Sequence, residues 1–186
     1  MSTAHKLVNI TLVDSRIIVD LRYATPHNIT NRVLYTSPTC YLHEDAAMAL
    51  KRVQDKLSEQ GLFLKIFDGY RPLRVQQFIW DLIQDERYVA NPANNKGRHT
   101  RGTAVDVTLI DIHGNELEMP SPFDDFTERA HRTNTDMSVA ARSNMMLLEK
   151  AMEAENFVGW PLEWWHYDVR GWNDDVRYPP LDVILP

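Results

Sequence analysis

Residues 104–110, AVDVTLI, show the alternation of side chains that is typical of a β-strand. Successive side chains of a strand point to opposite faces, so the two valines and Leu109 share one face and Asp106 lies on the other. Because the apolar face must pack against the core, the Asp106 side chain points away from the core. Aspartate is disfavoured in strands. This residue is therefore either a solvated or hydrogen-bonded side chain, or part of a functional site.

The rest of the pattern mixes helices and strands without strict β-α-β order. We expect strands at 7–12, 16–21, 62–67 and 163–169, and helices at 44–60, from Pro72 onward, and at 138–155. This order predicts an α+β fold with a mainly antiparallel central sheet flanked by about three helices. A chain of 186 residues that is 44% hydrophobic suits one domain, residues 1–186.

Charge and composition exclude several classes of partner. The net charge of -6 argues against nucleic acid, which requires a clustered basic surface. No apolar stretch reaches the roughly 18 residues of a membrane span. The start, MSTAHKLVNITLVDSR, lacks a signal-peptide pattern, and Cys40 is the only cysteine. We therefore expect a cytoplasmic protein with a small-molecule substrate. No residue pattern assigns an oligomeric state.

Two segments contain candidate metal ligands. In GRHTRGTAVDVTL, Gly102 allows a tight turn between His99 and Asp106, so that both side chains can converge. In LEWWHYDV, an offset of three places Glu163 and His166 on opposite faces of a regular strand. Both can serve one site only if Glu163 lies at the entrance of the strand. Taken separately, each segment also fits an ordinary hydrogen-bonded core.

Together the two segments predict a catalytic zinc site. Two histidines and a carboxylate, with one position left for water, are a typical ligand set for catalytic zinc. Such a zinc lowers the pKa of its bound water to about 7. A further carboxylate that is not a ligand can act as general base on this water, and Glu163 suits that role. The proposed ligands are His99, Asp106 and His166.

The segment FDGYRP, residues 67–72, provides a candidate cation. Gly69 permits an unusual backbone angle, and the residue before a proline is held away from the helical region, so Arg71 is rigidly aimed. Its guanidinium can stabilise the oxyanion of a tetrahedral intermediate. The alternative is a structural ion pair, for which Asp68 is the nearest partner in sequence.

The chain resembles the D-alanyl-D-alanine dipeptidases of the VanX type, within the wider zinc D,D-peptidase and hedgehog-like fold family. Five segments match in order and together span nearly the whole chain: RYATPHNIT (22–30), FDGYRP (67–72), RHTRGTAVDVTL (98–109), FDDFTERAH (123–131) and EWWHYD (163–168). The first and fourth of these are the segments that resemble the dipeptidase branch specifically.

The resemblance implies one zinc ion per chain held by His99, Asp106 and His166, with Glu163 as general base. It also implies that Arg71 polarises the scissile carbonyl. Tyr23 and Asp124 would receive the free ammonium of the substrate, and Asp124 is chosen over its neighbour because it follows Phe123 as the family pattern requires. One departure is visible: Gly97 stands where the family has a serine, which removes a hydroxyl that could contact the substrate.

We therefore expect zinc-dependent hydrolysis of D-Ala-D-Ala by a metal-activated water. Such an enzyme would act on peptidoglycan precursors, either in glycopeptide antibiotic resistance or in the recycling of alanine. One alternative is a zinc carboxypeptidase that trims longer cell-wall peptides and needs no site for an ammonium. Another is a non-enzymatic zinc-binding domain of the same fold, although a structural site would need neither Glu163 nor Arg71.

Overall fold

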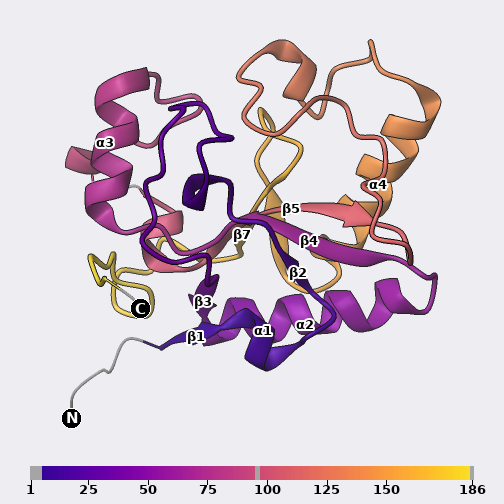
Figure 1. Cartoon of the computed structure of the whole chain (residues 1–186), viewed down its shortest axis with the longest axis horizontal. Helices are drawn as coiled ribbons and strands as arrows, with labels where there is room; N and C mark the ends of the chain where they lie inside the picture. The colour runs from indigo at the N-terminus through magenta and orange to yellow at the C-terminus, as the bar shows by residue number, and fades with distance from the viewer. Residues whose placement is uncertain (1–5, 95–96, 185–186) are drawn as a thin grey trace.

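The computed structural model describes residues 6–94 and 97–184, and its centre is a β-sheet (Figure 1). Within these residues the central sheet has five strands in the order β2-β4-β5-β7-β6. Their bounds are Ile18–Val19, Phe63–Asp68, Ala104–Ile110, His166–Val169 and Phe157–Gly159, in the same order. The β2–β4 pair is parallel and the other three pairs are antiparallel. A separate pair is formed by β1 (Leu7–Asn9) and β3 (Tyr41–His43).

Four α-helices occur in the described residues: α1 (Ile10–Val13), α2 (Glu44–Ser58), α3 (Leu73–Ile83) and α4 (Val139–Glu153). Four single 3-10 turns also occur: η1 (Arg22–Ala24), η2 (Pro92–Asn94), η3 (His99–Arg101) and η4 (Glu128–Ala130). The predicted α+β class, with a mainly antiparallel sheet and three substantial helices, is confirmed. Of the described helices, none is both long and apolar enough to cross a membrane.

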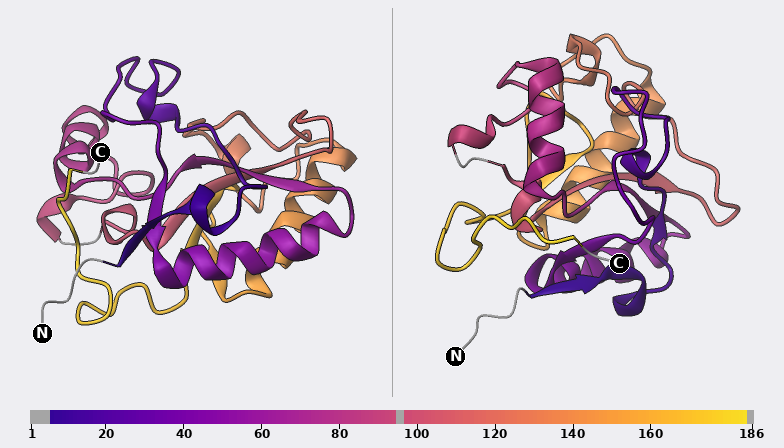
Figure 2. Two further views of the ribbon diagram at one scale, coloured as in Figure 1. Left: turned by 60° about the horizontal axis from the view of Figure 1, so that its bottom comes forward. Right: turned by 60° about the vertical axis from the view of Figure 1, so that its left-hand side comes forward.

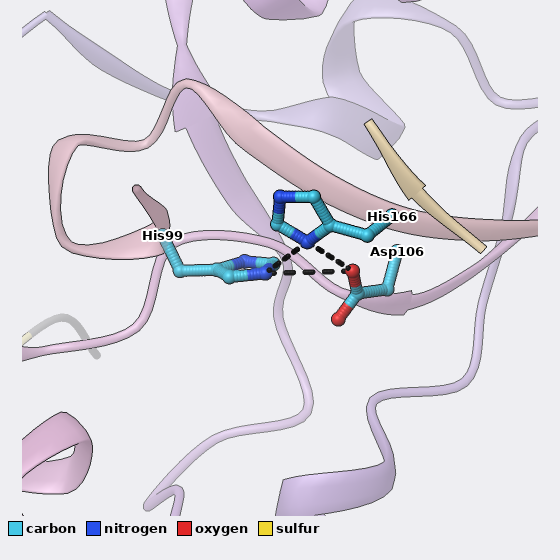
Figure 3. A group of neighbouring side chains, drawn as sticks. All are labelled: His99, Asp106 and His166. Carbon is cyan, nitrogen blue, oxygen red and sulfur yellow. Dashed lines mark hydrogen bonds and ion pairs between the residues drawn. The ribbon is translucent and has the colours of Figure 1, made fainter. Parts of the chain in front are cut away.

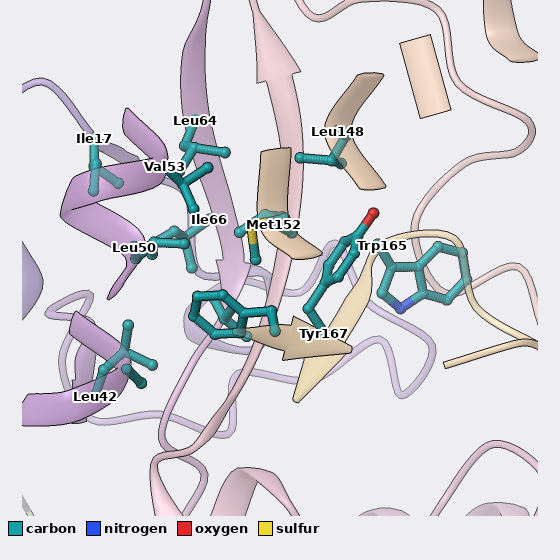
Figure 4. Packing of buried hydrophobic residues seen from close by; sticks show 14 of the residues in the cluster. Ile17, Leu42, Leu50, Val53, Leu64, Ile66, Leu148, Met152, Trp165 and Tyr167 are labelled. Atoms are coloured by element: carbon teal, nitrogen blue, oxygen red, sulfur yellow. The ribbon is translucent and has the colours of Figure 1, made fainter. Parts of the chain in front are cut away.

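The main core lies between the sheet and helices α2 and α4. Figure 4 shows side chains from both helices packed against those of β4 and β7: Leu50, Val53, Leu148, Met152, Leu64, Ile66 and Tyr167. The apolar face of β5 belongs to the same cluster. Asp106 therefore points away from this core, as its position in the alternating strand predicted.

The opposite side of the sheet is covered by α3 and irregular segments. Figures 1 and 2 show α3 beside the long loop that follows β2. Val75 and Ile79 of α3 form a second small core with Tyr23 and Val89. The sheet face that carries Asp106 is thus enclosed by loops rather than by a continuous helix layer, which leaves room for a cavity.

The N-terminal region differs from the predicted strand at 7–12. The strand ends at Asn9, whose side chain accepts a hydrogen bond of 3.0 Å from the amide of Thr11 and so caps helix α1. Ile10 is completely buried in the core. Its burial is achieved by the helical turn, and this tertiary contact overrides the strand preference of the β-branched residues.

Candidate active site

Three side chains form a compact cluster on the loop-covered face of the sheet (Figure 3). His99 Nε2 lies 3.2 Å from His166 Nδ1 and 3.4 Å from Asp106 Oδ1. His166 Nδ1 lies 3.0 Å from the same oxygen of Asp106. All three residues are buried. The structure therefore brings together the two histidines and the aspartate that the sequence predicted as metal ligands.

Strand register and one sharp turn produce this convergence. Asp106 of β5 and His166 of β7 are directly paired across the two strands, so both side chains leave the sheet on the same face. His99 lies in η3, and Gly102 directly after this turn has a φ of +68°. A Cβ on Gly102 would lie 2.8 Å from the amide nitrogen of His43, so this tight turn requires glycine.

The outer nitrogens of both histidines have fixed partners. His99 Nδ1 lies 2.8 Å from the carbonyl oxygen of Gly69, which can only accept, so His99 donates there and presents the lone pair of Nε2. His166 Nε2 lies 3.1 Å from Asp168 Oδ1, which directs Nδ1 toward the cluster. Hydrogen bonds of this kind hold metal-binding imidazoles in the correct tautomer and orientation.

The donor set fits a tetrahedral zinc ion. Zinc binds nitrogen and oxygen at about 2.0–2.2 Å, so two ligand atoms of a tetrahedron lie roughly 3.3 Å apart. The three separations of 3.0, 3.2 and 3.4 Å describe one face of such a tetrahedron. Two nitrogen lone pairs and a carboxylate oxygen this close together repel one another unless a proton or a cation lies between them.

The charged groups around the cluster shift the pKa values of its members. Burial lowers the pKa of His166, but the carboxylates of Asp168 and Asp106 outweigh burial and raise this pKa to about 10. Burial raises the pKa of Asp106, whereas His99 and His166 lower it, and the net shift is well below the usual aspartate range. The carboxylates around the cluster thus favour a positive charge at its centre, which a bound cation would supply.

Gly69 serves the cluster through its close packing. Its carbonyl oxygen holds His99, and a Cβ at this position would lie 2.6 Å from Cys40 Sγ and 3.0 Å from the carbonyl oxygen of Tyr41. The expectation of an unusual backbone angle at Gly69 is wrong, because its φ lies outside the left-handed region that other glycines of the described chain adopt. Lack of space for a side chain is the reason for glycine here.

Glu163 lies beside the cluster in the turn that precedes β7. The amide of His166 donates to the carbonyl oxygen of Glu163 over 3.3 Å, and this turn brings both side chains to one side of the chain. Glu163 Oε2 lies 3.8 Å from His166 Nδ1. Burial raises the pKa of Glu163 to about 8, which a cation at the cluster would lower again. Glu163 lies at the entrance of the strand, as a shared site requires.

Arg71 is held rigidly in the same cavity. Asp68 Oδ2 accepts from Nε at 3.0 Å and from Nη2 at 2.6 Å, and Gln76 Oε1 accepts from Nη1 at 2.9 Å. Tyr35 donates to the other oxygen of Asp68 at 2.6 Å. Burial lowers the pKa of Arg71, but the effects of Asp68 and its neighbours together outweigh burial. The net pKa of Arg71 lies above its ordinary value, so the guanidinium stays charged.

Tyr23 and Asp124 also meet at the cavity. The Tyr23 hydroxyl donates to Asp124 Oδ1 at 3.3 Å, and the amide of Ile29 donates to Oδ2 at 3.2 Å. Asp124 adopts a left-handed φ of +63°, a conformation that aspartate tolerates better than most residues. Burial raises the pKa of Asp124 to about 7. A cationic partner would compensate this desolvation and lower the pKa again.

The cavity that joins these groups has a volume of about 350 Å³. Its lining includes all seven residues selected from the sequence: Tyr23, Arg71, His99, Asp106, Asp124, Glu163 and His166. Trp165 lines the cavity as well, whereas Trp164 is buried with its indole nitrogen 3.1 Å from the carbonyl oxygen of Ser121. The volume suits a small ligand.

Three supporting residues were not selected from the sequence: Tyr35, Gln76 and Asp168. The first two act through Asp68 and Arg71, and no spacing in the sequence connects them to that pair. Asp168 had a usable signal, because residues two apart on a strand share a face and Asp168 therefore follows His166 into the site.

Comparisons with known proteins agree on one family. A family model described as D-ala-D-ala dipeptidase matches residues 3–184. The D-alanyl-D-alanine dipeptidase of Escherichia coli is 37% identical over 169 residues, which cover 91% of this chain and 87% of that protein. The enzyme of the same name from Enterococcus faecalis is 32% identical over 170 residues, covering 81% of this chain and 84% of that protein.

A solved structure shows a weaker similarity. The vancomycin resistance D,D-pentapeptidase VanY in complex with Zn(II) is 17% identical and has a TM-score of 0.47. The match covers 77% of this chain and 81% of that chain.

Proposed function

This chain belongs to the D-Ala-D-Ala dipeptidase family, and from that premise we propose that it is a zinc-dependent enzyme that hydrolyses the dipeptide D-Ala-D-Ala. The observation that carries the proposal is one cavity that contains three side chains close enough to hold a metal ion, and a buried carboxylate next to them. A structural metal site needs no free carboxylate of this kind.

His99, Asp106 and His166 would hold one zinc ion per chain. When bound there, zinc supplies Lewis acidity, which acidifies water and polarises a carbonyl group. Their outer partners, the Gly69 carbonyl oxygen and Asp168, keep both imidazoles oriented for this purpose.

Glu163 acts as the general base. Its carboxylate takes a proton from the attacking water and passes this proton to the leaving amine when the peptide bond breaks. Burial favours this role, since a carboxylate with a raised pKa is a stronger base than a solvated one. Arg71 presents a fixed positive charge toward the oxygen that becomes negative in the tetrahedral intermediate.

Tyr23 and Asp124 receive the free ammonium group of the dipeptide. The Asp124 carboxylate already accepts from the Tyr23 hydroxyl and from the Ile29 amide, and an ammonium would add the missing positive charge. A dipeptide offers this ammonium next to the scissile bond, whereas a longer peptide has a neutral amide at the same place. The site would thereby select substrate length.

We also propose where the enzyme acts and what its activity does in the cell. We place the activity in the cytoplasm, on the basis of the single cysteine, and in one domain of residues 1–186. The consequence for the cell would be depletion of D-Ala-D-Ala for the cell-wall precursor, as in glycopeptide resistance, or recovery of D-alanine.

The decisive experiment is hydrolysis of D-Ala-D-Ala and of N-acetyl-D-Ala-D-Ala by purified protein, with and without a chelator. We expect cleavage of the free dipeptide alone, lost on chelation and restored by zinc. Equal cleavage of the acetylated peptide would instead indicate a carboxypeptidase and remove the role of Asp124. No cleavage of either substrate by zinc-loaded protein would favour a non-enzymatic zinc-binding domain.

A further inference from the structure

The cavity contains a cationic side chain that has no part in the proposed reaction. Arg98 lines the cavity and immediately precedes the metal-cluster residue His99. Its side chain is 21% exposed, and Nη1 lies 3.2 Å from Asp168 Oδ2. The guanidinium carbon lies 4.0 Å from the ring centroid of Trp160 and 5.1 Å from that of Trp172. These contacts hold a positive charge at the cavity wall.

The other two arginines of the cavity are already engaged. All three guanidinium nitrogens of Arg71 donate to Asp68 or Gln76. Arg87 has a side chain that is 68% exposed, and Nε and Nη2 are bound to both oxygens of Asp85. Each of these two guanidinium groups thus already has a carboxylate on its Nε–Nη2 edge, which is the edge that suits a bidentate partner.

Arg98 differs in this respect. In the portion of the chain that the structure describes, Asp168 is the single polar partner of its guanidinium, and it engages Nη1. Nε and Nη2 retain N–H donors, the side chain is partly exposed, and Arg98 lines the cavity. A guanidinium edge with free donors matches the two oxygens of a carboxylate.

A free dipeptide is a zwitterion, so a cavity that fits it needs a place for each charge. The ammonium has Asp124, whereas the carboxylate at the other end has no partner among the residues assigned so far. We propose that Arg98 binds the C-terminal carboxylate of the dipeptide, and this inference rests on the proposed function. Asp124 and Arg98 together then require both chain ends to be free.

A purely structural role for Arg98 predicts a different outcome. Asp168 accepts from His166 Nε2 at 3.1 Å through Oδ1 while it pairs with Arg98 through Oδ2. If Arg98 served only to hold Asp168, its loss would loosen His166 and weaken metal binding. Such a change would reduce the hydrolysis of every substrate by the same factor.

The test compares D-Ala-D-Ala with its C-terminal amide, D-alanyl-D-alaninamide, in the zinc-loaded enzyme. We expect kcat/KM of the wild type to favour the free acid by on the order of 10- to 100-fold. Arg98→Gln should lose this preference through a higher KM for the acid, with kcat/KM for the amide unchanged. Arg98→Lys should restore part of it. Arg87→Gln, in the same cavity, is the matched control and should keep the full preference.

Zinc affinity, measured by competition with a chromophoric chelator, provides the second readout. We expect the same affinity in wild type and Arg98→Gln. Weaker zinc binding together with equal losses on both substrates would overturn the proposal in favour of the structural role. A wild type that cleaves acid and amide equally would also overturn it while leaving the dipeptidase function intact. A wild type that cleaves neither would instead refute the function itself.

Discussion

Asp68 holds Arg71 through a single carboxylate oxygen, Oδ2, which accepts from Nε at 3.0 Å and from Nη2 at 2.6 Å. The other oxygen accepts from the hydroxyl of Tyr35 and from the amide of Gly69. Both charged side chains are buried. The structural ion pair and the catalytic cation that the sequence left as alternatives are thus compatible, because the pair is what fixes the direction of Arg71.

Removing Asp68 should destabilise the protein strongly. Asp68→Ala leaves the buried guanidinium of Arg71 without its counter-charge, and breaking a buried pair in this way costs about 3–5 kcal/mol. The free energy of unfolding from urea denaturation measures this loss. Asp85→Ala, which breaks the exposed pair with Arg87, is the control and should leave the stability nearly unchanged. An equal loss of unfolding free energy in both variants would show that the buried pair stabilises the fold no more than the exposed pair does.

Glu163→Gln should reduce catalysis without emptying the metal site. The amide has nearly the same shape as the carboxylate but cannot accept a proton, so kcat should fall by about 10²- to 10⁴-fold. Zinc content after dialysis should equal that of the wild type, because Glu163 is not one of the three ligands. A variant that keeps a tenth or more of the activity would exclude Glu163 as the base.

The pH dependence should report Asp124. Its pKa is raised to about 7, so the carboxyl group is neutral below that pH and charged above it. Only the charged form can pair with the ammonium, so kcat/KM should fall as the pH decreases below about 7. Asp124→Asn should have low activity and an altered acidic limb, because the titration of Glu163 then remains without that of Asp124. The adjacent substitution Asp125→Asn should leave the limb as it is in the wild type, and an altered limb there would move the ammonium site to Asp125.

Zinc should stabilise the folded chain. A ligand that binds only the native state at 100 times its Kd adds about 2.7 kcal/mol to the free energy of unfolding. The Tm of chelator-treated protein should therefore rise on addition of zinc. Asp106→Asn should abolish most of this rise, because it removes a charged ligand, while Glu163→Gln should retain it. A zinc-induced rise that survives in Asp106→Asn would place the ion elsewhere.

Much of the central fold follows from local sequence patterns. The strand predicted at 104–110 coincides with β5, and the helix predicted at 44–60 corresponds to α2, Glu44–Ser58. Both have a regular apolar period that determines the element and its buried face. The strands β3 and β6 were not predicted, since each has three residues and exists through pairing with a partner distant in sequence.

The candidate site likewise contains residues that local sequence patterns predict and residues that they do not. The two segments that contain His99, Asp106 and His166 have a recognisable chemistry and spacing, so these residues were selected correctly as neighbours. Tyr35 and Gln76 were missed because their role depends on how loops and helix α3 fold over the sheet. Buried polar partners of this kind are chosen by three-dimensional proximity, which a single sequence does not encode locally.

The pairing of Asp106 with His166 also orders events during synthesis. His99 and Asp106 leave the ribosome in one stretch, but His166 belongs to β7, which follows after helix α4. A nascent chain, which emerges from its N-terminus, therefore carries only part of the candidate ligand set until β7 has been made. Under the proposed function, capture of the ion would have to wait for β7 to pair with β5, and a chain truncated before β7 would be inactive.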